Sequence, residues 1–138
     1  MTVTYMLDTN TVSYIAKGNS PAARASLEAL GMDEAVCISS ITEAELRYGL
    51  ARRPAAQALR ASVERLLLKF NILPWGSKEA AAYGALRAKL EVAGIVLSQL
   101  DLQIAAHAIA LGAVLVTNDK AFQRVTDLGK TVNWAMDV

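Results

Sequence analysis

The sequence predicts an α/β domain of three layers, α/β/α, built on a central and mostly parallel sheet of about five strands. Short apolar runs alternate with longer segments of helical periodicity, the order expected of βαβ units. The length of 138 residues matches one domain, and a chain of this size buries roughly two thirds of its surface on folding. Hydrophobic residues make up 54% of the chain, enough for a packed core without disulfides. We therefore expect residues 1–138 to fold as a single domain.

The N-terminal part predicts a strand followed by two helices. Val3–Leu7 is the first expected strand. A helix is expected over residues 10–17, because Gly18 supplies the residue favoured just beyond a helix C-terminus. The second helix has Pro21 in its first turn and Gly31 just past its end, the usual asymmetry of proline and glycine around a helix.

The middle of the chain alternates strands and helices. We expect strands at residues 35–39 and 71–74 and a helix at residues 41–51. Pro54 is expected to open the next helix, whose apolar residues are spaced to form one helical face. These apolar residues are Leu59, Val63, Leu66, Leu67 and Phe70.

The C-terminal part predicts three helices, a buried strand and a last edge strand. Helices are expected over residues 78–93 and 99–111, because a glycine follows each of them. Residues 113–116 form a short apolar run typical of a buried strand. A short helix over residues 119–125 and an edge strand over residues 131–134 complete about five strands and seven helices.

The composition excludes several classes of protein. The net charge is +1, from 14 basic and 13 acidic side chains, so the overall balance does not indicate nucleic-acid binding. The single cysteine, Cys37, excludes an intramolecular disulfide, and its place in a strand predicts an inert core thiol. The N-terminus lacks the features of a signal peptide, and the apolar run over residues 102–116 is shorter than the ~20 residues that span a bilayer. We expect a soluble cytoplasmic protein with no membrane partner.

Four carboxylates are expected at one rim of the sheet. Asp8 directly follows the first strand, and Asp119 follows the fourth strand closely. Glu45 lies about one turn into the helix after the second strand, and Asp101 lies in the first turn of its helix. With right-handed crossovers, the carboxyl ends of parallel strands share one rim, and ligands bind there. Clustered carboxylates repel one another, and hard divalent cations such as Mg²⁺ or Mn²⁺ relieve that repulsion.

Each of these acids also has a structural explanation. Asp8 and Asp119 both stand where a carboxylate caps a helix. Ser98 and Asp101 match a capping box, a pairing that is compatible with metal binding. Helix capping by these acids therefore neither requires nor excludes a metal site.

Glu43 and Glu45 cannot both face the rim, because residues two apart on a helix point about 200° apart. Ser40 and Glu43 match another capping box, which makes Glu45 the better ligand candidate. His107, among alanines, is expected to be a core residue rather than a catalyst.

Two further groups of polar residues are candidates for a role at the site. Five of them surround the same rim and are expected to orient ligands or waters. These five are Thr9, Asn10, Ser39, Thr117 and Asn118. A run of arginines after Glu45 fits either a basic flank for RNA or, as we favour, a solvated helix face. These arginines are Arg47, Arg52, Arg53, Arg60 and Arg65.

Four segments together resemble a known family. They are residues 6–11 (Met-Leu-Asp-Thr-Asn-Thr), 39–49 (Ser-Ser-Ile-Thr-Glu-Ala-Glu-Leu-Arg-Tyr-Gly), 100–107 (Leu-Asp-Leu-Gln-Ile-Ala-Ala-His) and 115–122 (Leu-Val-Thr-Asn-Asp-Lys-Ala-Phe). In this order and spacing, the chain resembles the PIN-domain ribonucleases, and most of all the VapC-type toxins of type II toxin–antitoxin systems. The resemblance covers nearly the whole chain, with Gln99 as a mild departure where close relatives often carry proline.

The resemblance implies a PIN-like fold and a Mg²⁺- or Mn²⁺-dependent endoribonuclease. The expected reaction is attack of a metal-activated water on an RNA phosphodiester, often in transfer RNA. Carried over by motif, the catalytic and metal-binding acids would be Asp8, Glu45, Asp101 and Asp119. The resemblance also implies a homodimer and a cognate VapB-type antitoxin that neutralises the toxin.

Two other functions remain open from the residues alone. The first is a receiver-like domain with a phosphoacceptor aspartate, although a single acid after the first strand argues against it. The second is a catalytically inert protein-binding module whose acids are helix caps. Asp8→Asn would leave that module functional, whereas in the nuclease it would relieve repulsion and stabilise the metal-free protein.

Overall fold

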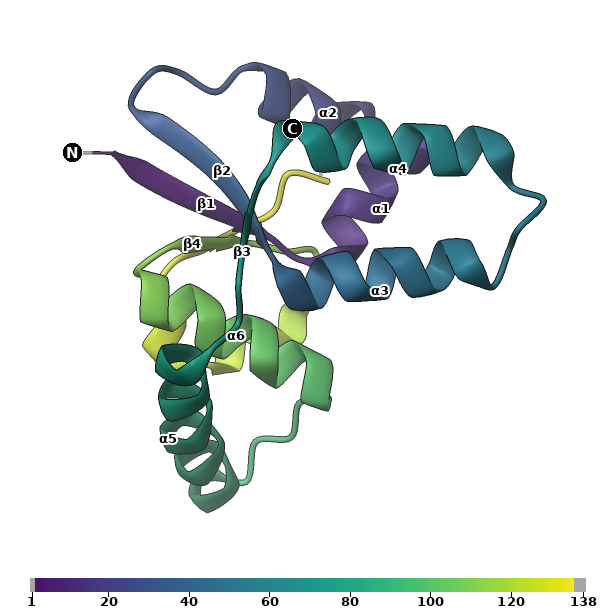
Figure 1. The fold of residues 1–138 in the computed structure, drawn as a ribbon. Helices are drawn as coiled ribbons and strands as arrows, with labels where there is room; N and C mark the ends of the chain where they lie inside the picture. Colours follow the sequence, from purple (N-terminus) through teal and green to yellow (C-terminus); the bar gives the residue numbers. More distant parts are fainter. Residues whose placement is uncertain (1, 136–138) are drawn as a thin grey trace.

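The computed structural model describes residues 2–135, and its five strands form one all-parallel sheet in the order β3-β2-β1-β4-β5 (Figure 1). The strands are β1 (Val3–Leu7), β2 (Glu34–Ser39), β3 (Asn71–Leu73), β4 (Val114–Val116) and β5 (Thr131–Val132). The central strand β1 pairs with β2 on one side and with β4 on the other. Receiver domains place their third strand beside the first, whereas β3 here lies at an edge, so the receiver-like alternative is wrong.

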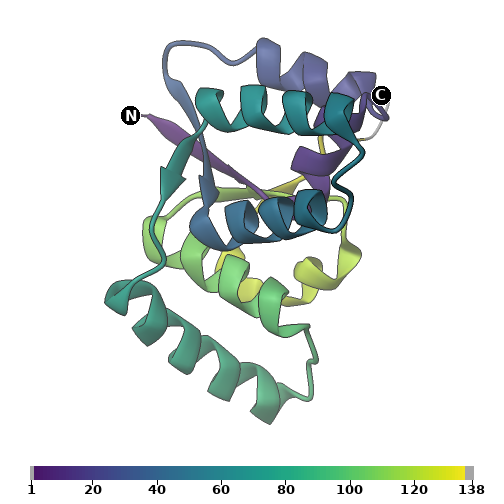
Figure 2. The ribbon, with the colours of Figure 1, turned by 45° about the vertical axis from the view of Figure 1, so that its right-hand side comes forward.

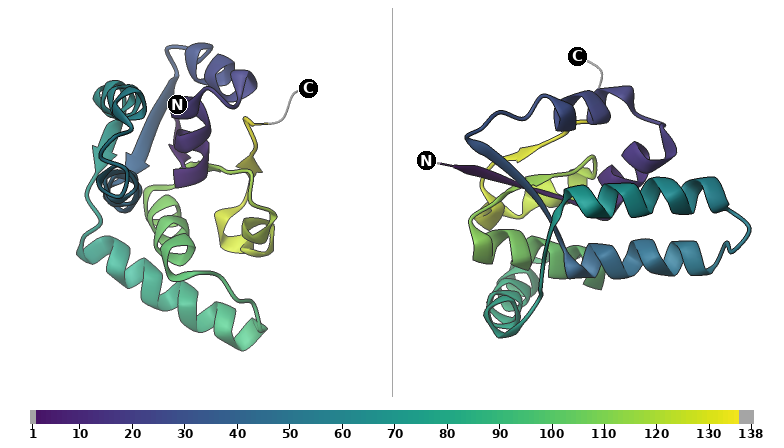
Figure 3. Two further views of the ribbon diagram at one scale, coloured as in Figure 1. Left: turned by 90° about the vertical axis from the view of Figure 1, so that its right-hand side faces the viewer. Right: turned by 45° about the horizontal axis from the view of Figure 1, so that its top comes forward.

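Within residues 2–135, six α-helices and two 3₁₀ helices surround this sheet. They are α1 (Thr9–Lys17), α2 (Pro21–Glu28), α3 (Ser40–Ala51), α4 (Gln57–Lys69), α5 (Ser77–Ala93), α6 (Gln99–Leu111), η1 (Lys120–Arg124) and η2 (Thr126–Leu128). Figures 2 and 3 show α5 and α6 on one side of the sheet and α1, α2 and α4 on the other. The predicted three-layer architecture is therefore confirmed. None of the helices in the described part of the chain combines the length and apolar character needed to cross a membrane.

Neighbouring residues of the central strands face opposite sides of the sheet and belong to two separate cores. Met6 and Leu115 pack with α5, α6 and the 3₁₀ helices, whereas Leu7 and Val116 pack with α1 to α4. Cys37 lies in the first core, where burial raises its pKa to about 11, as expected of an inert thiol. A parallel sheet covered by helices on both faces explains why its strands read as short apolar runs.

Pro54 does not open the fourth helix, contrary to the prediction. Residues 52–56 form a turn, in which the backbone N–H of Ala56 donates to the carbonyl of Arg53 at 3.0 Å. The helix begins at Gln57. Proline disfavours the helical conformation in the residue before it and suits turns, so it separates α3 from α4.

The last two predicted elements are shorter than expected. In place of the helix predicted over residues 119–125, the chain forms a 3₁₀ helix, η1, over Lys120–Arg124. The edge strand predicted over residues 131–134 contains only β5. Trp134 lies beyond it and packs against Tyr5, with the ring centroids 5.4 Å apart. An aromatic contact to β1 thus replaces the end of the strand.

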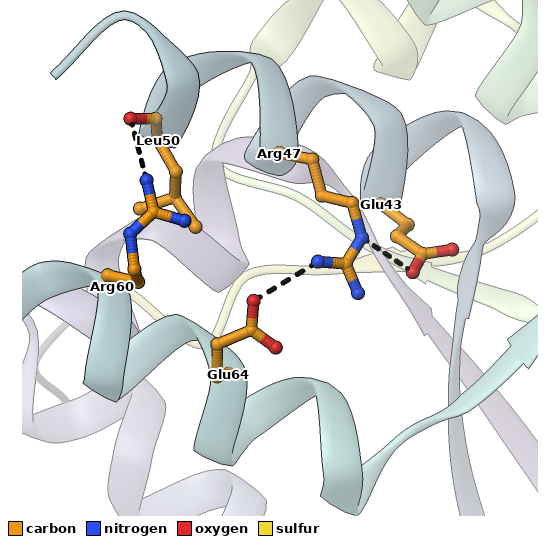
Figure 4. A network of polar contacts seen from close by, with 5 residues as sticks. All are labelled: Glu43, Arg47, Leu50, Arg60 and Glu64. Atoms are coloured by element: carbon orange, nitrogen blue, oxygen red, sulfur yellow. Dashed lines mark hydrogen bonds and ion pairs between the residues drawn. The ribbon is translucent and has the colours of Figure 1, made fainter. Parts of the chain in front are cut away.

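The antiparallel pair α3 and α4 extends beyond the sheet and is held together by polar contacts (Figure 4). Arg47 on α3 donates to Glu43 at 3.0 Å and to Glu64 on α4 at 3.1 Å. The guanidinium of Arg60 on α4 donates to the carbonyl of Leu50 at 3.3 Å. These contacts fix the orientation of α3 relative to α4, and with it the position of Glu45.

Phe122 is the aromatic anchor of the segment after β4, and its side chain is fully buried. Phe122→Ala is expected to lower the free energy of unfolding by about 3–5 kcal/mol, because it leaves a large cavity in the core. Urea unfolding measures this, and Leu68→Ala, at an exposed position of α4, should change the same quantity by less than about 0.5 kcal/mol. Equal losses in the two variants would contradict this packing.

Candidate functional site

The carboxylate of Asp8 is fixed between the ends of β1 and β4. It is 4% exposed and caps α1, because its Oδ1 accepts the backbone N–H of Thr11 at 2.9 Å. Its Oδ2 accepts the hydroxyl of Thr117 at 2.6 Å. The backbone N–H of Asp8 donates to the carbonyl of Val116 at 3.0 Å. The orientation of this carboxylate is therefore set by the fold itself.

Thr117 also positions Asp119. Its Oγ1 accepts the backbone N–H of Asp119 at 3.0 Å, and the Asp119 carboxylate accepts the N–H of Ala121 at 2.9 Å. Asn118 is exposed beside them, and its side-chain oxygen accepts the amide of Asn133 at 2.8 Å. Asp8 and Asp119 thus do cap helices, as their structural explanation expected.

Glu45 reaches the rim from α3. Its Oε1 accepts the hydroxyl of Thr9 at 3.0 Å, and the Oγ1 of Thr42 lies 3.3 Å from the same Thr9 oxygen. Glu43 instead forms its ion pair with Arg47. The two glutamates therefore diverge, as their spacing along the helix predicts.

Three of the four predicted acids line one pocket of about 190 Å³. Its polar lining residues are Asp8, Thr9, Asn10, Glu45, Ser98 and Asp101. Asp119 lines a second pocket, together with Thr117 and Asn118. The structure thus brings Asp8, Glu45 and Asp101 together in one pocket. Asp119 lies just after β4 and lines the other pocket.

The pKa of Asp101 reports how the four acids influence one another. Burial is the largest cause that raises this pKa, and the hydroxyl of Ser98 lowers it. The negative charges of Asp119, Asp8 and Glu45 raise it further. The four carboxylates are therefore close enough to repel one another through a partly dry rim.

A hard divalent cation would relieve this repulsion. Within residues 2–135, no three carboxylate, imidazole or thiol groups stand close enough together to ligate one ion directly. Mg²⁺, however, usually keeps several water molecules and bonds to only one or two carboxylates. The carboxylate and hydroxyl oxygens of the pocket therefore fit an ion that is held partly through water.

Ser39 and His107 form a buried pair that does not line the pocket. The hydroxyl of Ser39 accepts the N–H of Ile41 at 3.1 Å and lies 2.8 Å from Nδ1 of His107. Burial lowers the pKa of His107 and favours the neutral imidazole, with a smaller opposing effect from the charge of Glu79. Ser39, rather than the predicted box of Ser40 and Glu43, caps α3, because the tertiary contact holds its hydroxyl in place. His107 is a core residue, as expected.

Two buried threonines support the site, although the sequence analysis did not predict them as site residues. Thr11 donates its hydroxyl to the carbonyl of Val116 at 3.3 Å, and Thr42 lies against Thr9. Thr11 stands three residues after Asp8, the position that a capping carboxylate reaches. Thr42 stands three residues before Glu45, on the same side of the helix. These two spacings in the sequence could therefore have predicted that Thr11 and Thr42 support the site.

Comparisons with known proteins agree on one family. The family model described as "PIN domain" matches residues 5–128. Ribonuclease VapC2 of Rickettsia felis is 37% identical over 90% of this chain and 93% of its own length. The tRNA(fMet)-specific endonuclease VapC of Shigella flexneri is 33% identical over 95% of this chain and 98% of its own length.

Solved structures give the same answer. The crystal structure of VapBC2 from Rickettsia felis, bound to a DNA fragment from its promoter, contains a chain with a TM-score of 0.89 and 35% identity. That match covers 96% of this chain and 99% of the other. DNA-bound VapBC from Salmonella typhimurium gives a TM-score of 0.86 and 32% identity, over 96% of this chain and 98% of the other.

Asp101→Asn is expected to stabilise the protein in chelator at pH 7. The raised pKa means that wild type loses stability as pH rises through the pKa of folded Asp101. The advantage of Asp101→Asn should therefore shrink as pH falls through the pKa of folded Asp101 and vanish below 3.8, the ordinary pKa of an aspartate, where wild type is protonated in both states. Urea unfolding at a series of pH values measures the difference, and a destabilised Asp101→Asn at pH 7 would contradict the account.

Asp8 is expected to behave in the opposite way. Asp8→Ala removes the cap of α1 and leaves the hydroxyl of Thr117 without its acceptor, so it should cost about 1–3 kcal/mol of unfolding free energy. The sequence predicted that removing the charge of Asp8 would stabilise the metal-free protein. Because Asp8 makes these hydrogen bonds, we now expect that stabilisation from removing the charge of Asp101 instead. Urea unfolding in chelator measures the loss, and a stabilised Asp8→Ala would show that the two hydrogen bonds matter less than charge repulsion.

Proposed function

This chain belongs to the PIN-domain family and, within it, to the VapC ribonuclease toxins, and on that premise we propose that it is a Mg²⁺- or Mn²⁺-dependent endoribonuclease whose catalytic centre is the acidic pocket. The observation that supports this most directly is the convergence of Asp8, Glu45 and Asp101 on one pocket. The charge of Asp119 contributes to the same site, since it raises the pKa of Asp101.

The residues of the acidic pocket would hold the ion and place an RNA phosphate beside it. Asp8 is fixed by two hydrogen bonds before any ligand arrives, and Thr9 holds the carboxylate of Glu45. When bound, a hard divalent cation supplies an activated water and stabilises the negative charge that develops on a phosphodiester. The single histidine is buried against Ser39, so no imidazole of this chain serves as a base at the pocket.

The relatives indicate which RNA and which partner to test. One relative is described as a tRNA(fMet)-specific endonuclease, and the VapBC structures join a VapC chain to VapB. We propose for this chain transfer RNA as the substrate and a cognate VapB-type antitoxin as the partner. We also propose the homodimer that the family resemblance implies and the cytoplasmic location expected from the sequence. An acidic pocket also suits an inhibitor that inserts a basic side chain.

Asp101→Asn is expected to reduce RNA cleavage by roughly 10²–10³-fold, the usual effect of removing one preorganised electrostatic contact. The measurement is cleavage of total transfer RNA by purified protein with Mg²⁺ or Mn²⁺, with and without chelator. Asp127→Asn is the matched control, because that carboxylate pairs with Lys89 on the surface and should leave the rate unchanged.

Three outcomes of this assay have distinct meanings. Discrete fragments that need both metal and Asp101 support the proposed function. Fragments that persist in Asp101→Asn at the wild-type rate contradict it. If wild type gives no fragments and no metal shifts its melting temperature, the inert protein-binding module becomes the better account.

A further inference from the structure

A second groove is continuous with the acidic pocket. It has a volume of about 180 Å³ and lies between α1, α3 and α4. Thr9 and Glu45 line both this groove and the acidic pocket. Its basic lining residues are Lys17, Arg52 and Arg53, and we call it the basic groove.

The cations of the basic groove form no ion pair with the described part of the chain. Among residues 2–135, no carboxylate lies within salt-bridge distance of Lys17, Arg52 or Arg53. Arg47 on α3 shows the opposite arrangement, since Glu43 and Glu64 both pair with it (Figure 4). Arg47 is thus ion-paired, whereas the three cations of the basic groove have no carboxylate partner among the described residues.

The basic groove runs along α3 to the C-terminal end of this helix. Glu45 and Gly49 lie one turn apart on α3, and Arg52 and Arg53 follow directly after its last residue, Ala51; all four line the groove. Arg52 keeps helical dihedral angles and donates its backbone N–H to the carbonyl of Tyr48, so a rise of 1.5 Å per residue places it about 10 Å along the axis from Glu45. For a stacked strand this distance corresponds to about three nucleotides. Cations in the groove would thus meet phosphates close to the one that reacts.

An exposed aromatic ring stands at the edge of the basic groove. The guanidinium of Arg52 lies 5.5 Å from the ring centroid of Tyr48, whose residue is 64% exposed. Such a cation–aromatic pair is well suited to a nucleic-acid strand, because the ring stacks on a base while the cation meets the backbone.

A polyanion needs local attraction to approach this site. The net charge of +1 provides no general pull, and the four carboxylates of the rim repel phosphates. We propose that the basic groove binds backbone phosphates next to the scissile bond, with Arg52 and Arg53 as positioning residues. This inference rests on the proposed ribonuclease function and adds the path that the RNA takes away from the carboxylates.

The test is equilibrium binding of fluorescent transfer RNA in chelator, by anisotropy, over a range of salt concentrations. In Arg52→Gln/Arg53→Gln, the affinity should fall at least about 10-fold, and the slope of log affinity against log salt should fall by about 1.4, roughly 0.7 for each lost phosphate contact. Arg65→Gln/Lys69→Gln removes the same charge from a separate basic pocket formed with Arg24 and should leave the slope unchanged. Arg52→Lys/Arg53→Lys should keep most of the slope.

The results separate this inference from the proposed function. Cleavage by wild type with an unchanged slope in Arg52→Gln/Arg53→Gln would overturn the inference, keep the ribonuclease and leave the groove as a surface for a protein partner. A reduced slope without any cleavage by wild type would keep the RNA path and overturn the ribonuclease. Equal losses in the two double variants would also overturn the inference, since general charge would then explain binding.

Discussion

The hydrogen bond from Thr117 to Asp8 is the contact on which the site depends, because it ties the ends of two neighbouring parallel strands together. It fixes the carboxylate of Asp8, and the same hydroxyl accepts the backbone N–H of Asp119. The order of the strands places β1 and β4 side by side at the centre of the sheet. Pairing of these strands therefore assembles half of the acidic rim as the chain folds.

The acidic rim is held together by surrounding structure rather than by its own attraction. Burial first, and then the like charges of its neighbours, raise the pKa of Asp101, whereas helix caps and threonine hydroxyls hold the other carboxylates in place. Capping and metal binding are therefore compatible tasks for one side chain. A site that is strained without its cation is common where activity and stability compete.

Topology made most of the site predictable from the sequence. The acids after each strand had to share a rim, and helical spacing was enough to prefer Glu45 over Glu43. The role of Ser39 was not predictable, because its partner His107 lies 68 residues away along the chain. Likewise, only the packing of α4 against α3 shows that Glu64 pairs with Arg47, whereas no carboxylate in residues 2–135 pairs with Arg52 or Arg53. Local rules also gave Pro54 the wrong place, since proline suits both a first turn and a connection.

The central proposal is that Asp8, Glu45 and Asp101 hold one cation in the acidic pocket, with the charge of Asp119 beside it. Calorimetric titration of Mn²⁺ into the protein tests it most directly. The account predicts saturable binding to wild type and to Asp127→Asn, and a loss of that binding in Asp101→Asn. Equal affinity in all three proteins, or no binding to wild type, would contradict it.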